Sequence, residues 1–256
     1  MAPSSLPEGQ PALRPRRLVI AGMEGCTGCA VCEVRARGIC SALNDQELEQ
    51  LARAAVRVTM PPGRVFVEEG AKADAFFNIT AGTAKLFKSL PDGRRQITGF
   101  VGVGHFLGLA VSDRYAFGAE AIDQVKVCRF SRERLEMVVE EFPRLERRLL
   151  SEAANELVAA QEQMLLLGRK TARERVASFL YEQLLDGYGN DIPSGAKLHF
   201  PMTRADIADF LGLTVETVSR TLSGLRRDGL LAMGAGHEIS VMAPARLQAI
   251  AKGEEG

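Results

Sequence analysis

Several features that define other protein classes are missing from this 256-residue sequence. No run approaches the roughly eighteen apolar residues that mark a membrane-spanning helix. The formal net charge is +0, so bulk charge does not indicate a nucleic-acid partner, and such a partner must be inferred from a local motif. A secretory signal is also missing, because the only apolar run near the start, residues 18–23, is broken by Glu24. We therefore expect a cytoplasmic protein with no membrane partner, in which thiols stay reduced.

Cysteine is scarce as well, but its placement is informative. Four of the five cysteines lie close together as Cys26, Cys29, Cys32 and Cys40, and Cys128 stands alone much further along the chain. Several thiolates in one short loop can reach a single ion or cluster at little cost in chain closure, and a distant ligand would tie that loop to a separately folded region. The spacing therefore predicts a metal site.

The identity of the metal stays open at this point. An odd cysteine count without a secretory signal argues against structural disulfides. Four thiolates satisfy tetrahedral zinc, although the gap from Cys32 to Cys40 does not give paired zinc knuckles. All-sulfur ligation also suits iron-sulfur clusters. A ferredoxin-like electron carrier is a third interpretation, but its motif would occupy a small part of so long a chain.

The chain changes character along its length, which predicts two modest domains. Residues 1–25 are rich in proline and are expected to form a flexible tail. A helix is expected from Leu43 to Ala55, followed by short β-rich segments separated by glycine and proline turns. Such alternation indicates an antiparallel sandwich or roll. The expected strands are 64–67, 75–80, 83–89, 95–101 and 124–130, and Cys128 falls on the last of them, so residues 26–130 form the expected sensor domain.

A long helix is expected after the β-rich region, within a linking segment over residues 131–168. No proline or glycine interrupts the chain between Pro143 and Gly168. Apolar residues recur there at alternating spacings of three and four, which predicts a dimerisation seam. The seam residues are Leu150, Ala153, Leu157, Ala160 and Met164. A second apolar stripe, Leu149, Val158 and Leu165, is expected to pack on the chain's own β-roll.

Residues 169–248 carry the signals of a winged helix-turn-helix. Thr203 and Thr214 are expected to cap two short helices, and Gly212 permits a tight left-handed turn between them. On the second helix the predicted buried stripe is Val215, Val218, Leu222 and Leu225. A hairpin from residue 230 to 241, with glycines at its tip, would form the wing.

The opposite face of that second helix carries groups that could read DNA. Arg220 can donate two hydrogen bonds to guanine, Glu216 can accept from cytosine N4, and Ser219 can contact a base edge or a phosphate. An ordinary solvated face, with an ion pair between Glu216 and Arg220, would produce the same pattern. Residues 203–227 hold four arginines and three acidic residues, so we expect modest non-specific affinity and specificity that depends on direct contacts from a dimer.

The order of these parts resembles the cyclic-AMP receptor/fumarate-nitrate reductase regulator superfamily, and within it the fumarate-nitrate reductase regulator branch. The resemblance rests on segments 96–100, 164–167, 202–204 and 212–220 and on the cysteine loop, which is similar to that of FnrL-like members. It implies an α+β fold: an antiparallel β-roll of the cupin-like jelly-roll type, a long dimerisation helix and a winged helix-turn-helix. It further implies an oxygen-labile 4Fe-4S cluster held by Cys29, Cys32, Cys40 and Cys128, with Cys26 as a substitute candidate.

The resemblance also implies partners. The Glu-x-x-Ser-Arg signature implies half-sites of the TTGAT type in double-stranded DNA, bound by a homodimer, and the expected DNA-contacting residues are Thr203, Arg204, Thr214, Glu216, Thr217, Ser219 and Arg220. The loop at residues 89–95 matches in position one that family activators use against RNA polymerase, although an ordinary hairpin turn would look the same. Cyclic-nucleotide binding is not expected, because neither the Gly-Glu carboxylate nor the Arg-Ser-Ala motif of such receptors appears; the chain has residues 104–108 without a carboxylate and Arg114-Tyr115-Ala116 instead.

Together these observations predict an oxygen- or redox-responsive transcription regulator rather than an enzyme. Two alternatives are kept. One is a regulator of the same fold whose cysteines hold zinc or respond to thiol oxidation, and the other is an iron-sulfur electron carrier.

Overall fold

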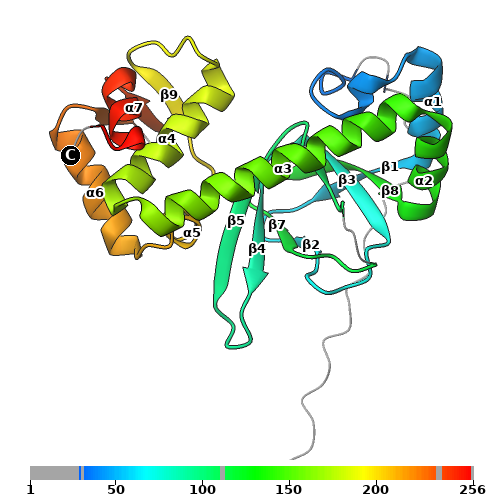
Figure 1. Ribbon diagram of the computed structural model, residues 1–256, viewed down its shortest axis with the longest axis horizontal. Helices are drawn as coiled ribbons and strands as arrows, with labels where there is room; N and C mark the ends of the chain where they lie inside the picture. Colours follow the sequence, from blue (N-terminus) through cyan, green and yellow to red (C-terminus); the bar gives the residue numbers. More distant parts are fainter. Residues whose placement is uncertain (1–28, 30–31, 110–112, 235–237, 255–256) are drawn as a thin grey trace, which may run out of the picture.

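A computed structural model describes residues 29, 32–109, 113–234 and 238–254 of the chain. The predicted tail over residues 1–25, together with Cys26, lies outside these described residues. The chain forms a β-roll and a helical C-terminal part, with one long helix running between them (Figure 1). This is the α+β architecture that the sequence predicts.

The β-roll consists of two four-stranded antiparallel sheets. The first has the strand order β1-β8-β3-β6 and the second β2-β7-β4-β5. Apolar side chains that alternate along the strands meet between the sheets, including Val58, Ile79 and Val127. The strand bounds are β1 Ala55–Met60, β2 Val65–Val67, β3 Ala75–Ala81, β4 Ala84–Ser89, β5 Arg95–Val101, β6 Phe106–Leu107, β7 Gly118–Ala121 and β8 Val125–Ser131.

The sequence analysis found five of these strands and missed three. Strand β1 was missed because it follows helix α1 (Asp45–Ala54) directly, with no turn residue between Ala54 and Ala55. Strands β6 and β7 are short and lie among glycines, so they lack the alternating pattern that identifies a strand. Their pairing with β3 and with β2 and β4 is long-range in sequence and leaves little local signal.

Helices pack at one end of the roll. Helix α1 begins at a capping box in which Asn44 and Glu47 bond each other's backbone N–H groups. Helix α2 (Arg132–Glu141) follows β8, and a short 3-10 helix, η1 (Ile39–Ala42), lies against the start of helix α3 (Pro143–Arg169). Ile39, Leu43 and Leu145 share one apolar cluster there, so the cysteine loop, α1, α2 and α3 form a continuous core.

Helix α3 has 27 residues and spans the molecule from α1 and α2 at one end to the C-terminal part at the other (Figure 1). Its fully buried side chains are Leu145 and Leu166, near its two ends. The prediction that Val158 and Leu165 pack on the chain's own β-roll is wrong, because they are 53% and 59% exposed. Helix α3 anchors to the rest of the subunit through its ends, which leaves the middle of the helix uncovered. Leu149, from the same predicted stripe, does pack against the apolar cluster.

The C-terminal part is a small helical domain with a three-stranded sheet of order β10-β11-β9. Thr203 and Thr214 each accept a hydrogen bond from the third backbone N–H of the helix that follows, and Gly212 has a left-handed φ of 61°, as predicted. Val215 is 40% exposed, so its predicted burial is wrong. It occupies the first turn of its helix, beyond the core that covers Val218. The bounds are α4 Ala172–Tyr188, β9 Ala196–His199, α5 Arg204–Leu211, α6 Val215–Arg227, β10 Leu231–Met233, β11 Glu238–Val241 and α7 Pro244–Lys252.

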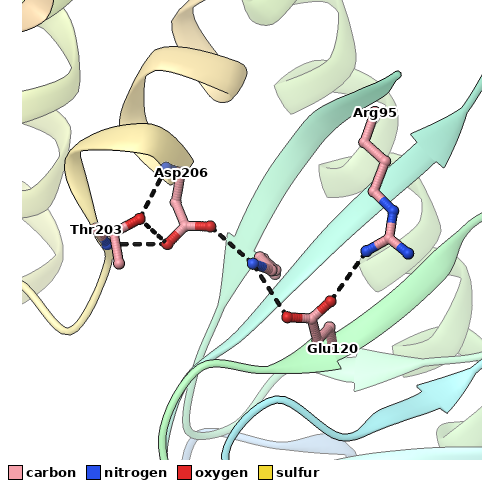
Figure 2. A network of polar contacts seen from close by, with 5 residues as sticks. Arg95, Glu120, Thr203 and Asp206 are labelled. Atoms are coloured by element: carbon pink, nitrogen blue, oxygen red, sulfur yellow. Dashed lines mark hydrogen bonds and ion pairs between the residues drawn. The ribbon is translucent and has the colours of Figure 1, made fainter. Parts of the chain in front are cut away.

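A polar network joins the β-roll to helix α5 (Figure 2). Lys85 Nζ on β4 lies 3.1 Å from Glu120 Oε1 on β7 and 2.7 Å from Asp206 Oδ1 on α5. Arg95 Nη1 lies 3.1 Å from the other Glu120 oxygen, and Asp206 also accepts hydrogen bonds from Thr203. Burial lowers the pKa of Lys85, but the hydrogen bonds to Asp206 and Glu120 outweigh burial, and its net pKa is raised. Lys85 therefore stays charged at neutral pH.

Aromatic packing reinforces the same junction. The Phe100 ring on β5 lies 6.0 Å from the Phe179 ring on α4 and 5.2 Å from the Phe210 ring on α5. The Gln163 side chain on α3 donates to the Phe210 carbonyl over 2.8 Å. Strands of the β-roll, α3 and the first helix of the helix-turn-helix are thus in direct contact.

Candidate cysteine site and DNA-reading surface

The cysteine loop folds as a succession of tight turns. The Cys32 N–H donates to the Cys29 carbonyl over 3.3 Å, and the Arg35 N–H donates to the Cys32 carbonyl over 3.0 Å. Cys40 lies on η1, which contacts α3, and Arg148 on α3 donates a hydrogen bond to the carbonyl of Arg37, which lies just before η1. The loop therefore has a defined attachment to the long helix.

Cys128 lies on β8, a central strand of its sheet, with its side chain on the outer face. It is directly opposite Arg57 on β1 and Asn78 on β3. Directly opposed residues of antiparallel strands project from the same face, so one row across the sheet presents a guanidinium group, a thiol and an amide. Val127, which precedes Cys128 on β8, points into the core of the roll. The outer face of this sheet is polar where it meets the cysteine loop.

The loop and this sheet enclose a cavity of about 290 Å³. Cys29, Cys32, Cys40 and Cys128 all line it, and all four are half-buried. The described residues that line it include three cationic side chains and no carboxylate, which favours an anionic occupant. The cationic residues are Arg35, Arg57 and Lys126. The structure thus brings all four predicted ligands to one cavity.

The four thiols form an all-sulfur donor set, which suits both zinc and an iron-sulfur cluster. Within the part of the chain that the structure describes, no three His, Cys, Asp or Glu side chains converge closely enough to hold one ion together. An iron-sulfur cluster has its iron atoms at separate corners, each bound by a different thiolate, so its ligands need to surround a cavity rather than meet at a point.

The predicted DNA-contacting residues lie on or beside one face of the helix-turn-helix. Glu216 and Arg220 are exposed on α6, and Ser219 is half-buried beside them. Thr214 and Thr217 bond each other at the start of α6, while Thr203 and Arg204 open α5. Hydrogen bonds from its own backbone N–H and from Thr214 lower the pKa of Glu216, so its carboxylate is ionised at neutral pH.

The face is exposed, as the alternative of a solvated face expects, but Glu216 and Arg220 do not form the ion pair of that alternative. The Arg220 guanidinium instead lies 3.5 Å from the Thr217 hydroxyl, and the ion pairs found between described residues do not join it to Glu216. Arg220 and Glu216 thus project separately from α6. This arrangement leaves each side chain available for a base edge.

A basic hollow of about 210 Å³ next to this face includes residues that the sequence analysis did not assign to a site. Arg226 and Met233 line it together with the predicted residues Arg204 and Ser219. Met233 belongs to the wing strand β10, so the hollow lies between α5, α6 and the wing. The sequence signal that could have identified Arg226 is its position as a basic residue near the end of α6. The proximity of Arg226 to Arg204 depends on the tertiary fold.

The predicted dimerisation seam is exposed on α3. Leu150, Leu157 and Met164 are 63%, 60% and 65% exposed, and Ala153 and Ala160 are exposed between them. Val158 and Leu165 widen this apolar strip. Large apolar side chains in a continuous strip are uncommon on a monomer's surface and mark an interaction site.

Comparison with known proteins places this fold and site in a class. Residues 174–250 match the model of the Crp-like helix-turn-helix domain, and residues 57–142 match that of the cyclic nucleotide-binding domain. These two domains, in this order, define DNA-binding transcription regulators rather than enzymes. The chain belongs to the Crp/Fnr family, which confirms the family resemblance that the sequence analysis identified.

Individual relatives agree with this assignment. The chain is 42% identical to the nitrogen fixation regulation protein FixK of Bradyrhizobium diazoefficiens over 228 residues, 87% of this chain and 93% of FixK. It is 35% identical to the transcriptional activator protein FnrL of Cereibacter sphaeroides over 224 residues, 86% of this chain and 90% of FnrL. The solved structure of FixK2 from Bradyrhizobium japonicum has a TM-score of 0.71 at 35% identity, covering 77% of this chain and 96% of FixK2.

The helices of the described ranges were also compared with the length and apolarity that a membrane requires. None of them is long and apolar enough to cross one.

Proposed function

We propose that this regulator senses oxygen through a 4Fe-4S cluster bound by Cys29, Cys32, Cys40 and Cys128. The observation that carries the proposal is that Cys128 lines one cavity together with the three loop cysteines, and that the described lining residues include three cations and no carboxylate. The similarity to the transcriptional activator protein FnrL supports a role in transcription activation. The cytoplasm is the proposed location, since it keeps such thiols reduced.

The cysteine loop can transmit the state of the site to the dimerisation helix. When bound, the cluster supplies reactivity toward oxygen. Cys29, Cys40 and Cys128 pack against the same apolar cluster as Leu145 and Leu149 of α3. Four intact ligands would fix the loop against β8 and hold η1 against α3, and loss of the ligation would loosen both contacts.

This attachment is coupled, in the proposal, to homodimer formation through Leu150, Ala153, Leu157, Ala160 and Met164. The seam lies on α3 directly after the segment that the cysteine loop contacts. Coupling of about 1 to 3 kcal/mol would be enough to switch occupancy if the dimer dissociates near its cellular concentration. A dimer would present two α6 helices to the two halves of a palindromic site.

On DNA, each α6 would read a TTGAT-type half-site. Arg220 is placed to donate to guanine and Glu216 to accept from cytosine, while Thr203, Arg204, Thr214, Thr217 and Ser219 surround them for base or phosphate contacts. Glu216 and Arg220 are both exposed and do not form an ion pair with each other, which supports these separate roles. We propose no role for a cyclic nucleotide, although the roll matches that domain model.

The β4–β5 turn is the proposed contact for RNA polymerase. It projects from the roll (Figure 1), and residues 89–95 are exposed. Its shape is fixed by Asp92, which accepts hydrogen bonds from the backbone and side chain of Arg94. Changing Asp92 and Gly93 should lower transcription activation in a purified system while DNA affinity is unchanged. Equal loss of both activities would contradict a polymerase contact.

The decisive experiment is metal and sulfide analysis of protein purified without air, combined with DNA-binding assays before and after brief air exposure. We expect about four iron and four sulfide per subunit, and site-specific DNA binding that falls after exposure. Stoichiometric zinc without sulfide, in protein that still binds DNA specifically, would replace the proposal with the alternative of a zinc- or thiol-based regulator. The other alternative, an electron carrier, is set aside because the chain belongs to a family of DNA-binding regulators.

A further inference from the structure

Asn78 is a buried amide with an unmet hydrogen-bonding requirement. Its side chain is 3% exposed, and its Oδ1 atom has no hydrogen-bond partner among the described residues. Buried side-chain oxygens nearly always have a partner, because desolvation without one costs free energy. Asn78 therefore points to a group that belongs beside it.

The position of Asn78 identifies where that group would lie. It lines the cysteine cavity and is directly opposite Cys128 on the neighbouring strand. Side chains opposed in this way have Cβ atoms roughly 5 Å apart on the same face of the sheet. The amide thus lies within one side chain's reach of the Cys128 thiol.

Gly38 keeps the cysteine loop close to this amide. A Cβ atom at residue 38 would lie 3.0 Å from Asn78 Oδ1 and 3.3 Å from Nδ2, closer than most Cβ contacts. Gly38 is the residue that caps η1, which carries Cys40. The loop therefore covers Asn78 because residue 38 has no side chain, and the amide remains facing the cavity.

The chemistry of the cavity determines whether the oxygen or the NH₂ group of the Asn78 amide can bond to an occupant. Among the lining residues that the structure describes, thiols lie with Arg35, Arg57 and Lys126 and there is no carboxylate, so an occupant is expected to be anionic and to accept hydrogen bonds. An asparagine amide can present either its oxygen or its NH₂ group by rotation about one bond, and the two ends are assigned from the hydrogen-bond network. Facing thiolate or sulfide, the NH₂ end is the one that forms a bond.

We propose that Asn78 is a positioning residue that donates an N–H···S hydrogen bond to the Cys128 thiolate or to a sulfide of the group bound there. This inference rests on the proposed 4Fe-4S site. Hydrogen bonds to the sulfurs of a cluster offset its negative charge, which raises its reduction potential and makes its thiolate ligands harder to displace. Asn78 would then determine how long the cluster stays bound, without itself being a ligand.

The test compares Asn78→Leu with wild type and with Thr80→Val, all isolated without air. Leucine preserves the size of the side chain but has no donor. Thr80 lines the same cavity, and its hydroxyl already donates to the Lys126 carbonyl, so Thr80→Val is the matched control. Asn78→Ser retains a donor, and Asn78→Asp keeps the shape without an N–H. The two readouts are the rate of iron transfer to a chelator under anaerobic conditions and the reduction potential of the cluster.

We expect equal initial iron and sulfide in every variant, with iron transfer about 10-fold faster in Asn78→Leu and a more negative potential. Asn78→Asp should shift the potential in the same direction as Asn78→Leu and by at least as much, because it adds a negative charge as well as removing the N–H, whereas Asn78→Ser should be intermediate and Thr80→Val should match wild type. If Asn78→Leu does not fold, Asn78→Asp, which has no N–H, is compared with Asn78→Ser, which retains a donor.

The outcomes separate this inference from the proposed function. Wild-type protein without iron and sulfide would overturn both. A wild-type cluster with the potential and transfer rate of Asn78→Leu unchanged would overturn the role of Asn78 and leave the proposed function standing. Equal changes in Asn78→Leu and Thr80→Val would also overturn it, because the effect would then come from any alteration of the cavity.

Discussion

Replacing Lys85 with methionine tests whether a single ammonium group holds the β-roll to the helix-turn-helix. Its Nζ atom lies between Glu120 and Asp206, and the three side chains are only 18%, 17% and 11% exposed. Removing one partner of a fully buried ion pair costs about 3 to 5 kcal/mol, because the remaining charges are left without compensation. Here Glu120 keeps Arg95 and Asp206 keeps Thr203, so we expect a smaller loss of about 2 kcal/mol in the free energy of unfolding.

The pH dependence of this effect follows from the two pKa shifts. Burial raises the pKa of Asp206, but hydrogen bonds from Lys85 and Thr203 lower it by a larger amount. The net pKa of Asp206 is therefore below its ordinary value of 3.8. Its contribution to stability is therefore present above that value and is lost as pH falls through the lower folded pKa. The net pKa of Lys85 is raised above 10.5, so its contribution is present below that value and is lost as pH rises through the higher folded pKa. The penalty for Lys85→Met should be constant between about pH 5 and pH 9.

Urea unfolding of wild type, Lys85→Met, Asp206→Asn and the double variant provides the measurement. Asparagine at residue 206 can still cap α5, so the cycle isolates the contact with Lys85. We expect a coupling free energy of about 1 to 2 kcal/mol. Additive single-variant effects, or a Lys85→Met change within about 0.5 kcal/mol of wild type, would refute the reasoning.

Three further predictions concern the proposed sensor, DNA contacts and dimer. Cys128→Ser should abolish cluster retention, as should serine at each loop ligand, whereas Cys26→Ser should not; iron and sulfide analysis that gave the reverse would reassign the site. Arg220→Ala should cost about 1 to 3 kcal/mol per half-site and flatten preference at one base pair, while Glu216→Ala should relax preference without lowering non-specific affinity. DNA affinity measured on single-base operator variants at several salt concentrations distinguishes the effects of the two substitutions. If both variants instead lost affinity equally for all sequences, with changed salt slopes, α6 would not be the helix that reads the bases. Leu157→Glu should yield monomers in anaerobic sedimentation, and an unchanged dimer would contradict the seam.

Features that depend on a few neighbouring residues were predictable from the sequence. The caps at Thr203 and Thr214, the left-handed turn at Gly212 and the continuous helix from Pro143 depend on hydrogen bonds and backbone preferences that span three or four residues. The spacing of Cys29, Cys32 and Cys40 similarly placed three candidate ligands in one short loop, since chain connectivity alone keeps them close.

Burial and cross-strand neighbours depended on the tertiary structure. The repeat along α3 is apolar on two adjacent stripes, and periodicity does not say which of them the roll will cover; Val158 and Leu165 remained exposed. The register of β3 and β8 places Asn78 opposite Cys128, and the packing of α5 on β4 brings Asp206 to Lys85. These residues are separated by long stretches of chain, so only strand register and domain packing bring them together, and neither is encoded in local spacing.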